Sequence, residues 1–479
     1  MTLGELDRNP APARQRLQTA GLGPLAVEAK IGLFAAAAGA LLEQGAPADG
    51  PVHGFFVPGR IEVLGKHTDY AGGRSIVTAV EQGFCMVAAP RFDALVTVRA
   101  VGLGETAAFD LGPELTARHG HWSNYPMTAC RRLVRNFRAD QGADLAFASD
   151  LPVASGMSSS SALIVATALV VMAVNGLFRH PRFRRQLPDA LSLAAYLGTV
   201  ENGQTFGELP GDRGVGTFGG SEDHTAMLCS RAGHLGQFAY CPARFQRYLP
   251  VPAGHLFAVA FSGVVAEKTG AAQELYNRAS LRAAAAVQAW REATGGTEVY
   301  LAEVVAGGSA ARDRLRQVLG RVTGPPFSGA ELVRRVEHFI AEDGEILEAA
   351  GEALAHGDLT RFGELVDRSQ ELTDTLLQNQ VPQTVVLARL ARQAGAVAAS
   401  AFGAGFGGSV WALVEQSRAE EFVSQWRAGY AQAYPAEADR AEIFLTQAGP
   451  AVVGLSEDLG LPLPPQGDRP PAAGPGSSR

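Results

Sequence analysis

The residues best suited to bind a polyol follow a strand-like run that ends at Leu64. The turn after it carries Lys66, His67, Thr68 and Asp69 in consecutive positions. Several hydrogen-bond donors beside one carboxylate suit a polyol, because sugar hydroxyls both donate and accept hydrogen bonds. The same cluster is equally typical of an ordinary polar hairpin loop, so alone it does not decide between the two.

A second segment, Leu151–Leu163, could bind phosphate, because a Gly and Ser loop leads directly into an apolar stretch. We expect that stretch, Ser159–Asn175, to form a buried helix whose unpaired N–H groups and positive dipole end attract anions. Serine hydroxyls can add ligands to phosphate or magnesium. The loop lacks the Gly-Lys-Ser/Thr element of a Walker sequence, and a serine run alone is more typical of a helix cap or a linker.

A third segment, Phe402–Val410, is rich in glycine and could bring the backbone close to a ligand or to another loop. Flexible turns often have such a composition, so this segment alone is weak support for a binding site. We expect a strand on each side of it, over Val397–Ser400 and Ser409–Val414.

Strand-like and helix-like segments must position these residues, and together they predict an α+β chain of two domains. Strands are expected at 60–64, 75–79, 84–89, 95–100 and 255–261, and helices at 25–44, 124–138, 159–175, 187–202, 271–294, 330–356, 360–376 and 384–393. Residues 203–220 are expected to form a loop. Prolines near residue 250 mark a change of pattern, so we expect an N-terminal extension with a helix over 1–48, domains over 49–250 and 251–455, and a disordered Pro-rich tail over 456–479.

Composition and charge argue against several classes of protein. The chain has 479 residues, 47% hydrophobic and 19% charged, so it can bury large cores and is not disordered throughout. The net charge of −7 argues against a nucleic-acid or anionic-membrane partner. The apolar stretch Ile31–Leu42 is too short to span a bilayer, and no signal peptide opens the sequence. The scattered cysteines form no C-x-x-C pair, which indicates the cytoplasm rather than a zinc or disulfide framework.

In their order and spacing, the three segments resemble the GHMP small-molecule kinases. The first is similar to the galactokinase signature Gly-Arg-Val-Asn-Leu-Ile-Gly-Glu-His-Thr-Asp-Tyr, which it matches at Gly59, Arg60, Gly65 and 67–70. The second resembles the phosphate loop Pro-x-Gly-x-Gly-Leu-Ser-Ser-Ser-Ala, with departures at Ala154, Met157 and Ser161. The third matches Gly-Ala-Gly-Phe-Gly-Gly at every position. The resemblance covers about residues 50 to 450.

The resemblance implies a fold, an activity and cofactors. The fold would be that of a two-domain GHMP kinase, with an N-terminal domain like domain 2 of ribosomal protein S5 and a ferredoxin-like C-terminal domain. The active site would lie in the cleft between them. The activity would be phosphorylation of a monosaccharide at its anomeric hydroxyl with ATP and Mg²⁺, most simply galactose to galactose 1-phosphate. The partners would be the sugar and ATP, without nucleic acid or membrane, and a monomer is favoured.

The resemblance also implies roles for individual residues. Asp223 matches the catalytic aspartate, which could accept the proton of the sugar hydroxyl, and Arg60 matches an arginine that could keep that carboxylate ionised. Ser160 and Glu201 match the magnesium ligands. The sugar contacts would be Lys66, His67, Thr68, Asp69, Gly220 and Tyr276. The ATP contacts would be Ala154, Ser155, Gly156, Met157, Ser158, Ser159, Ser160, Gly403, Gly405 and Gly407.

Lys66 is the sharpest departure, because the family has a glutamate there that faces the O6 end of the sugar. Lysine only donates hydrogen bonds, and it is one of three lysines in a chain whose Lys and Arg together number 41. Either Lys66 favours a carboxylate at C6, as in a uronic acid such as galacturonate, or it pairs with Glu62 or Asp69 and points away from the sugar.

Two other functions stay open. One is a non-catalytic sensor of the same fold that binds sugar and ATP. The other is a kinase for a different GHMP metabolite, such as mevalonate or homoserine, against which the turn His67–Tyr70 argues.

Overall fold

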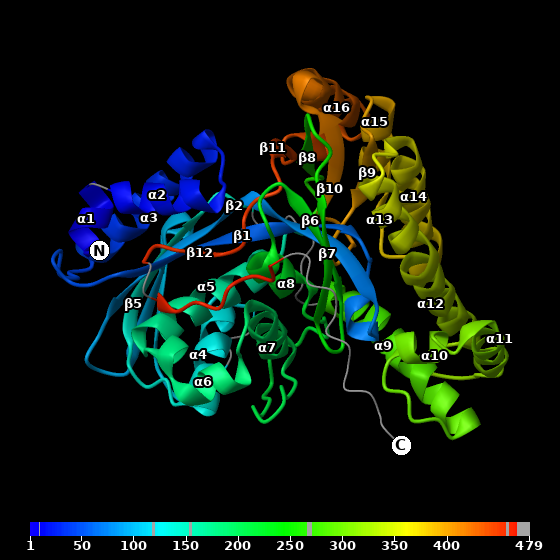
Figure 1. Cartoon of the computed structure of the whole chain (residues 1–479), viewed down its shortest axis with the longest axis horizontal. Coiled ribbons are helices and arrows are strands. Elements are labelled where there is room, and N and C mark those ends of the chain that lie inside the picture. Colours follow the sequence, from blue (N-terminus) through cyan, green and yellow to red (C-terminus); the bar gives the residue numbers. More distant parts are fainter. Residues whose placement is uncertain (9, 117–119, 153–155, 266–270, 457–458, 467–479) are drawn as a thin grey trace.

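Two β-sheets organise the chain in a computed structural model, which describes residues 1–466 except 9, 117–119, 153–155, 266–270 and 457–458 (Figure 1). In the described residues, the first sheet has eight strands in the order β12-β1-β2-β5-β3-β4, with β6 beside β2 and β7 beside β6. Only the pair β3–β5 is parallel among these strands. The strands are β1 (His53–Leu64), β2 (Arg74–Pro90), β3 (Leu95–Ala100), β4 (Glu105–Asp110), β5 (Ala143–Ser149), β6 (His234–Ala239), β7 (Arg244–Pro250) and β12 (Val453–Gly454).

The second sheet is antiparallel and has the order β11-β8-β10-β9. Its strands are β8 (His255–Phe261), β9 (Ala398–Ala401), β10 (Ser409–Glu415) and β11 (Glu442–Thr446). The chain therefore changes sheets between Pro250 and His255, close to the expected domain join. The short strand β12 returns to the first sheet, where Val453 pairs with Phe56. The expected unit 251–455 thus ends outside the second sheet, and the domain bounds themselves stay a prediction.

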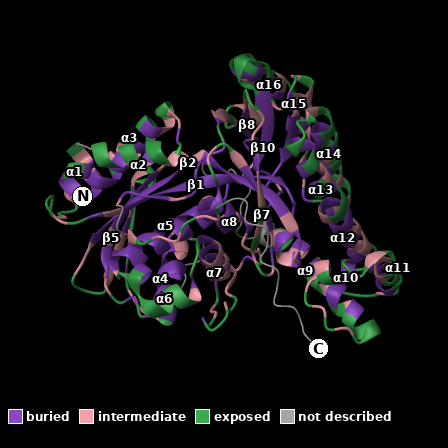
Figure 2. Ribbon diagram, viewed as in Figure 1, coloured by how far each residue is buried: buried purple, intermediate pink, exposed green. Residues whose placement is uncertain are grey.

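Helices cover both faces of the first sheet (Figure 1). Side chains of successive residues on a strand point to opposite faces, and Phe55 and Phe56 of β1 accordingly pack into two different cores. The helices on the Phe56 face are α1 (Leu3–Arg8), α2 (Ala11–Ala20) and α3 (Pro24–Glu43). Those on the other side are α4 (Asn124–Phe137), α5 (Ser159–Val174), α6 (Pro181–Gln186), α7 (Ala190–Asn202) and α8 (Glu222–Cys229). Figure 2 shows the strands between these layers as buried.

The second part of the chain is largely helical. Helices α15 and α16 pack on one face of the second sheet, and α14 contacts β9. Helices α9 to α12 form a separate core that includes Ala71, a residue of the turn after β1. The helices are α9 (Ala271–Thr294), α10 (Leu301–Val305), α11 (Gly308–Leu319), α12 (Gly329–Ala341), α13 (Leu347–Ala355), α14 (Leu359–Leu372), α15 (Pro382–Gln393), α16 (Ala419–Ala433) and α17 (Pro435–Ala438). Single helical turns are η1 (Asp69–Ala71), η2 (Val101–Leu103), η3 (Leu177–Arg179), η6 (Gln416–Arg418) and the π-helical η4 (Glu342–Ile346) and η5 (Thr373–Leu377).

Three predicted elements differ from the structure for local reasons. The two strands expected between residues 75 and 89 are one strand, β2, because β1 pairs with it on both sides of Gly83. Helix α7 starts at Ala190 rather than 187, because the side chain of Asp189 caps it by accepting from the N–H of Ser192. The single helix expected over 330–356 is interrupted by the π-helical turn η4.

The N-terminal helix and the C-terminal tail also differ from expectation. By length and composition α3, with 20 residues, could cross a membrane, whereas the sequence predicts that its apolar stretch Ile31–Leu42 is too short to do so. Here its residues Phe34 and Leu41 pack with strand residues in the core of the Phe56 face, and a core helix passes the same test. In the tail that was expected to be disordered, Leu459 and Leu461 pack against the main core. Residues 467–479 lie outside the described residues.

A buried ion pair connects α3 to the start of the phosphate-loop segment. Lys30 is 1% exposed, and its Nζ pairs with the carboxylate of Asp150. The other oxygen of that carboxylate accepts a hydrogen bond of 2.8 Å from the N–H of Gly83 in β2. Asp150 directly precedes Leu151, so the N-terminal extension holds the end of β5 where the loop begins.

We expect Lys30→Met to lower the free energy of unfolding by about 1–3 kcal/mol, since it removes a hydrogen bond between charged groups and leaves Asp150 with one partner fewer. Chemical denaturation of the full chain measures the change. The control is Arg14→Met, which breaks the more exposed pair Arg14–Glu28 and should cost less than about 1 kcal/mol. Equal effects of the two substitutions would show that the Lys30 pair does not anchor the extension.

Candidate active site

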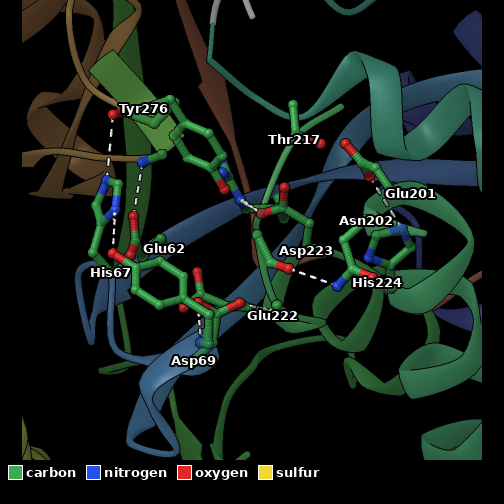
Figure 3. A pocket seen from close by; sticks show the side chains of 17 residues that line it. Glu62, His67, Asp69, Glu201, Asn202, Thr217, Glu222, Asp223, His224 and Tyr276 are labelled. Atoms are coloured by element: carbon green, nitrogen blue, oxygen red, sulfur yellow. Dashed lines mark hydrogen bonds and ion pairs between the residues drawn. The ribbon is translucent and has the colours of Figure 1, made fainter. Parts of the chain in front are cut away.

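One cavity brings the first and third sequence segments together (Figure 3). Its walls come from β1, the turn after β1, the C-terminal end of α7, residues 217–224, α9 and the Gly-rich loop. The predicted site residues that line it are Arg60, His67, Asp69, Glu201, Gly220, Asp223, Tyr276 and Gly403. Residues from the part of the chain that forms the first sheet and from the part that forms the second therefore line the same cavity.

An ion pair between Arg60 and Asp223 lies at the centre of this site. The Nε of Arg60 donates to Oδ1 of Asp223 over 2.7 Å, and Nη1 donates to the carbonyl oxygen of Gly156, also over 2.7 Å. Burial alone would lower the pKa of Arg60, but the carboxylates of Asp223, Glu62 and Glu222 raise it. Arg60 therefore stays a cation and joins the carboxylate of Asp223 to the loop that contains Gly156.

Ser158 in the phosphate-loop segment contacts Asp223. Ser158 stands just before α5 with φ +58°, and its hydroxyl donates to Oδ2 of Asp223. Ser159 and Ser160 form the first turn of α5, where free N–H groups favour phosphate. The side chain of Met157 is buried in the core, so only its backbone can serve a nucleotide. Ala154 and Ser155 lie outside the described residues.

The Gly-rich loop makes the close approach that its composition predicted. A Cβ added to Gly403 would lie 2.7 Å from the carbonyl oxygen of Gly156 and 3.0 Å from Nη2 of Arg60. One added to Gly405, which has φ +81°, would lie 2.3 Å from the carbonyl oxygen of Asn379. Gly407 has φ +132°. Among these glycines Gly403 lines the cavity, while Gly405 and Gly407 shape the loop.

Glu201 and Ser160 both act on the side chain of Tyr125. Burial raises the pKa of Tyr125 to about 12, the charge of Glu201 also raises it, and a hydrogen bond with Ser160 lowers it. Oε2 of Glu201 accepts from the hydroxyl of Ser161 over 2.6 Å and lies 3.3 Å from Nε2 of His224. The described residues contain no group of three His, Cys, Asp or Glu side chains that could hold a metal. One carboxylate and one hydroxyl suit Mg²⁺, which usually takes its remaining ligands from phosphates and water.

The turn after β1 supplies the polar wall opposite the phosphate loop. His67 has φ +56°, and its Nδ1 lies 2.9 Å from the hydroxyl of Tyr70. The carboxylate of Asp69 accepts from the N–H groups of Tyr70 and Glu222 over 2.8 and 3.2 Å. A Cβ on Gly220 would lie 2.4 Å from Oδ2 of Asp69, so glycine is required there. The ring of Tyr276 lies 5.6 Å from that of His67.

Lys66 and Thr68 do not line the cavity. Lys66 is 1% exposed, its backbone N–H donates to Glu342, and its Nζ has no hydrogen-bond partner among the described residues. Burial raises the pKa of Glu62, and the charge of Lys66 opposes that rise most strongly. The charge of Lys66 therefore acts on Glu62, in line with the second alternative, and a contact with the sugar stays a prediction. Thr68 Oγ1 lies 2.7 and 2.6 Å from the carbonyl oxygens of Gly65 and Arg74, which fixes the turn.

Several cavity residues were not predicted as part of the site. They are Glu62, Tyr70, Gly198, Asn202, Thr217, Gly219, Glu222, His224 and Ala404. Glu62 could have been found, since it follows Arg60 by two positions on a strand and so shares its face. Thr217 and Gly219 belong to a loop with no regular pattern, so nothing in the sequence placed them.

Family models match three parts of the chain. They describe the GHMP kinases N terminal domain over residues 124–212, the GHMP kinases C terminal over 350–432 and the galactokinase galactose-binding signature over 45–90. Galactokinase from Chloroflexus aggregans is 31% identical over 376 residues, which are 78% of this chain and 87% of that protein. Galactokinase from a Roseiflexus species is 30% identical over 397 residues, 82% of this chain and 91% of that protein.

Solved structures share the fold. The crystal structure of Lactococcus lactis galactokinase complexed with galactose matches with a TM-score of 0.70 and 24% identity, over 87% of this chain and 99% of that one. The crystal structure of Methanococcus jannaschii mevalonate kinase matches with a TM-score of 0.53 and 14% identity, over 83% of this chain and 98% of that one.

The two-domain fold and the family models define a GHMP kinase, which confirms the predicted fold class and the prediction of an enzyme. Within that class the chain belongs to the galactokinase family, as its sequence relatives establish.

We expect kcat/KM for the sugar to fall as the pH is lowered through about 6. Burial raises the pKa of Asp69 from 3.8 to about 6. The hydrogen bonds from two backbone N–H groups lower this pKa, and the charges of Asp223 and Glu62 raise it. Below that pH the carboxyl is protonated and loses its capacity as a full acceptor for sugar hydroxyls. The profile is measured from pH 5 to 8 at saturating ATP and Mg²⁺.

The matched variant is Asp69→Asn, whose residual activity should lack this step because the titrating group is gone. A wild-type profile that stays flat between pH 5 and 7 would contradict the role given to Asp69.

Proposed function

We propose that this protein transfers the γ-phosphoryl group of ATP to the anomeric hydroxyl of galactose and yields galactose 1-phosphate. The observation that carries the proposal is the Arg60–Asp223 pair, which lines the cavity together with residues of the turn after β1 and contacts Gly156 in the loop before α5. The names of the sequence relatives support galactose as the sugar.

In the proposed mechanism Asp223 is the general base. It accepts the proton of the anomeric hydroxyl while the oxygen attacks the γ-phosphorus and the bond to ADP breaks. Arg60 keeps Asp223 ionised and adds positive charge beside the transferring group, where it stabilises negative charge in the transition state. His67, Asp69, Gly220 and Tyr276 orient the sugar.

The nucleotide would lie with its phosphates at the N-terminal end of α5, against Gly156 and 158–160. Ser160 and Glu201 would hold Mg²⁺, which neutralises charge on the phosphates when bound. Ser161 and His224 contact Glu201 and fix its carboxylate in place. We further propose that the enzyme acts in the cytoplasm as a monomer, with sugar and ATP as its partners.

Asp223→Ala should lower kcat about 10²–10⁴-fold, the usual loss for a general base. Formation of galactose 1-phosphate is followed by phosphorus NMR and by coupled ADP release. The control is Asp93→Ala, which removes an exposed carboxylate that pairs with Arg91 and does not line the cavity, so it should leave kcat unchanged. Wild-type turnover by the Asp223 variant would refute the assignment of the base, and a wild type that never consumes ATP with sugar would favour the sensor.

Glu201→Gln should raise the Mg²⁺ concentration that half-saturates activity, because an amide is a weaker ligand for a hard cation than a carboxylate. Titration of Mg²⁺ at fixed ATP measures this, with near-ultraviolet circular dichroism as the check on folding. An unchanged Mg²⁺ dependence would remove Glu201 from the metal site.

A further inference from the structure

The loop of residues 203–220 connects two groups of the candidate site. It follows α7, whose last turn carries Glu201, and it precedes α8, which carries Asp223. Gly219 and Gly220, at the end of the loop, line the cavity. A loop of this length without a helix or strand of its own needs specific contacts to keep one position, so the contacts of this loop bear on the geometry of the site.

A carboxylate in the middle of the loop pairs with two arginines of α4. Oδ2 of Asp212 accepts from Nε of Arg131 over 2.8 Å, and its Oδ1 lies 3.6 Å from Nη1 of Arg132. The side chains of Asp212, Arg131 and Arg132 are 2%, 6% and 0% exposed. Separation of buried charges from their partners is strongly destabilising, so these contacts fix the middle of the loop to α4.

Other side chains of α4 contact the stretch that leads to Asp212. Nη2 of Arg132 donates to the carbonyl oxygen of Gln204 over 2.5 Å, and Nδ2 of Asn136 donates to that of Pro210 over 3.1 Å. Oδ1 of Asn136 in turn accepts from Nε of Arg132 over 2.9 Å. Because these buried polar groups satisfy one another, α4 fixes the loop at residues 204 and 210 as well as at Asp212.

Asp212 also closes the loop onto the end of α7. Its N–H donates to the carbonyl oxygen of Gly203 over 2.9 Å, and its Oδ1 accepts from the N–H of Gly214 over 3.1 Å. The next residue, Val215, donates its N–H to the carbonyl oxygen of Glu201 over 2.8 Å. A Cβ on Gly214 would lie 2.4 Å from that same oxygen. The chain therefore leaves α7 and returns to it at the same place, beside Glu201.

From this closure the chain continues to the wall of the sugar cavity. Nδ2 of Asn202 donates to the carbonyl oxygen of Gly219 over 2.8 Å. A Cβ on Gly219 would lie 2.6 Å from the hydroxyl of Tyr276, and one on Gly220 would lie 2.4 Å from Oδ2 of Asp69. Such close packing leaves these two glycines little room to move. Their position against the sugar residues therefore depends on where the chain returns to α7.

We propose that Asp212 is a positioning residue for the sugar site. It does not line the cavity, so it acts through the loop that ends in Gly219 and Gly220. This inference rests on the proposed function, since it assumes that the sugar occupies this cavity. The loop before α5 and the Gly-rich loop come from other parts of the chain, so binding of the nucleotide should not depend on Asp212.

Asp212→Asn is the variant that tests this role, because it keeps the shape of the side chain and removes its charge. Two buried guanidinium groups then lose their counter-ion, and the middle of the loop leaves α4. We expect KM for galactose to rise about tenfold, since the cavity wall at residues 219–220 is displaced, while KM for ATP stays within about twofold of wild type. Steady-state kinetics with each substrate varied in turn measure both values.

The matched control is Asp144→Asn. Asp144 also pairs with an arginine, Arg91, over 3.0 Å and accepts from Thr97, but it lies on β5 and does not line the cavity. A general loss of stability lowers the folded fraction and hence the apparent kcat, whereas it leaves KM unchanged. Asp144→Asn should therefore leave both KM values at their wild-type level.

A second variant, Arg131→Lys, keeps the positive charge but has no Nε to donate to the carboxylate of Asp212. It should raise KM for galactose in the same direction by a smaller factor. A wild-type KM for galactose in Asp212→Asn would overturn the proposal, and so would equal rises in KM for galactose and ATP. A wild type that does not phosphorylate galactose would instead overturn the proposed function.

Hydrogen exchange of the wild type tests the loop without turnover, and it decides if the variants do not fold. The N–H groups of Gly214 and Val215 should exchange slowly before any ligand is added, because Asp212 keeps both in hydrogen bonds. Exchange as fast as that of an unfolded peptide would overturn the inference.

Discussion

The site depends on a buried arginine that makes two contacts at once. Arg60 extends from β1 toward Asp223 at the start of α8 and toward the backbone of Gly156 in the phosphate loop. Neither contact is local in sequence, so the first sheet, α8 and the loop before α5 must all be in place for both to form. A buried charge without its partner is strongly destabilising, which makes this one side chain a constraint on all three elements.

The second part of the chain completes the same centre. Gly403 lies against both Gly156 and Arg60, and its N–H donates to Glu62 on the strand that carries Arg60. Glu342 in the π-helical turn η4 accepts from the N–H groups of Gly65 and Lys66 at the base of the sugar turn. Contacts from the Gly-rich loop and from η4 thus hold the end of β1 and its turn, so residues from both parts of the chain form the candidate site.

Much of this arrangement could be predicted from the sequence. The rest could not, and the reason can be given for each residue. Strong local patterns placed α5, α9 and β8 at or near their observed bounds, and the resemblance to the GHMP kinases implied roles for Arg60 and Asp223. The sequence left two alternatives for Lys66 open, because residue type reveals a charge but not the direction of its side chain; in the structure Lys66 is buried and does not line the cavity. Glu222 was not predicted, since only the folded chain shows that it is buried at the cavity.

The most direct test of the account is a crystal structure of the complex with galactose, Mg²⁺ and a non-hydrolysable ATP analogue. The account predicts the anomeric oxygen within hydrogen-bonding distance of Asp223, about 2.6–3.2 Å, with the Arg60–Asp223 pair intact and the phosphates at the N-terminal end of α5. A sugar whose anomeric oxygen points away from Asp223, or an Arg60 that leaves Asp223 when both ligands bind, would contradict it.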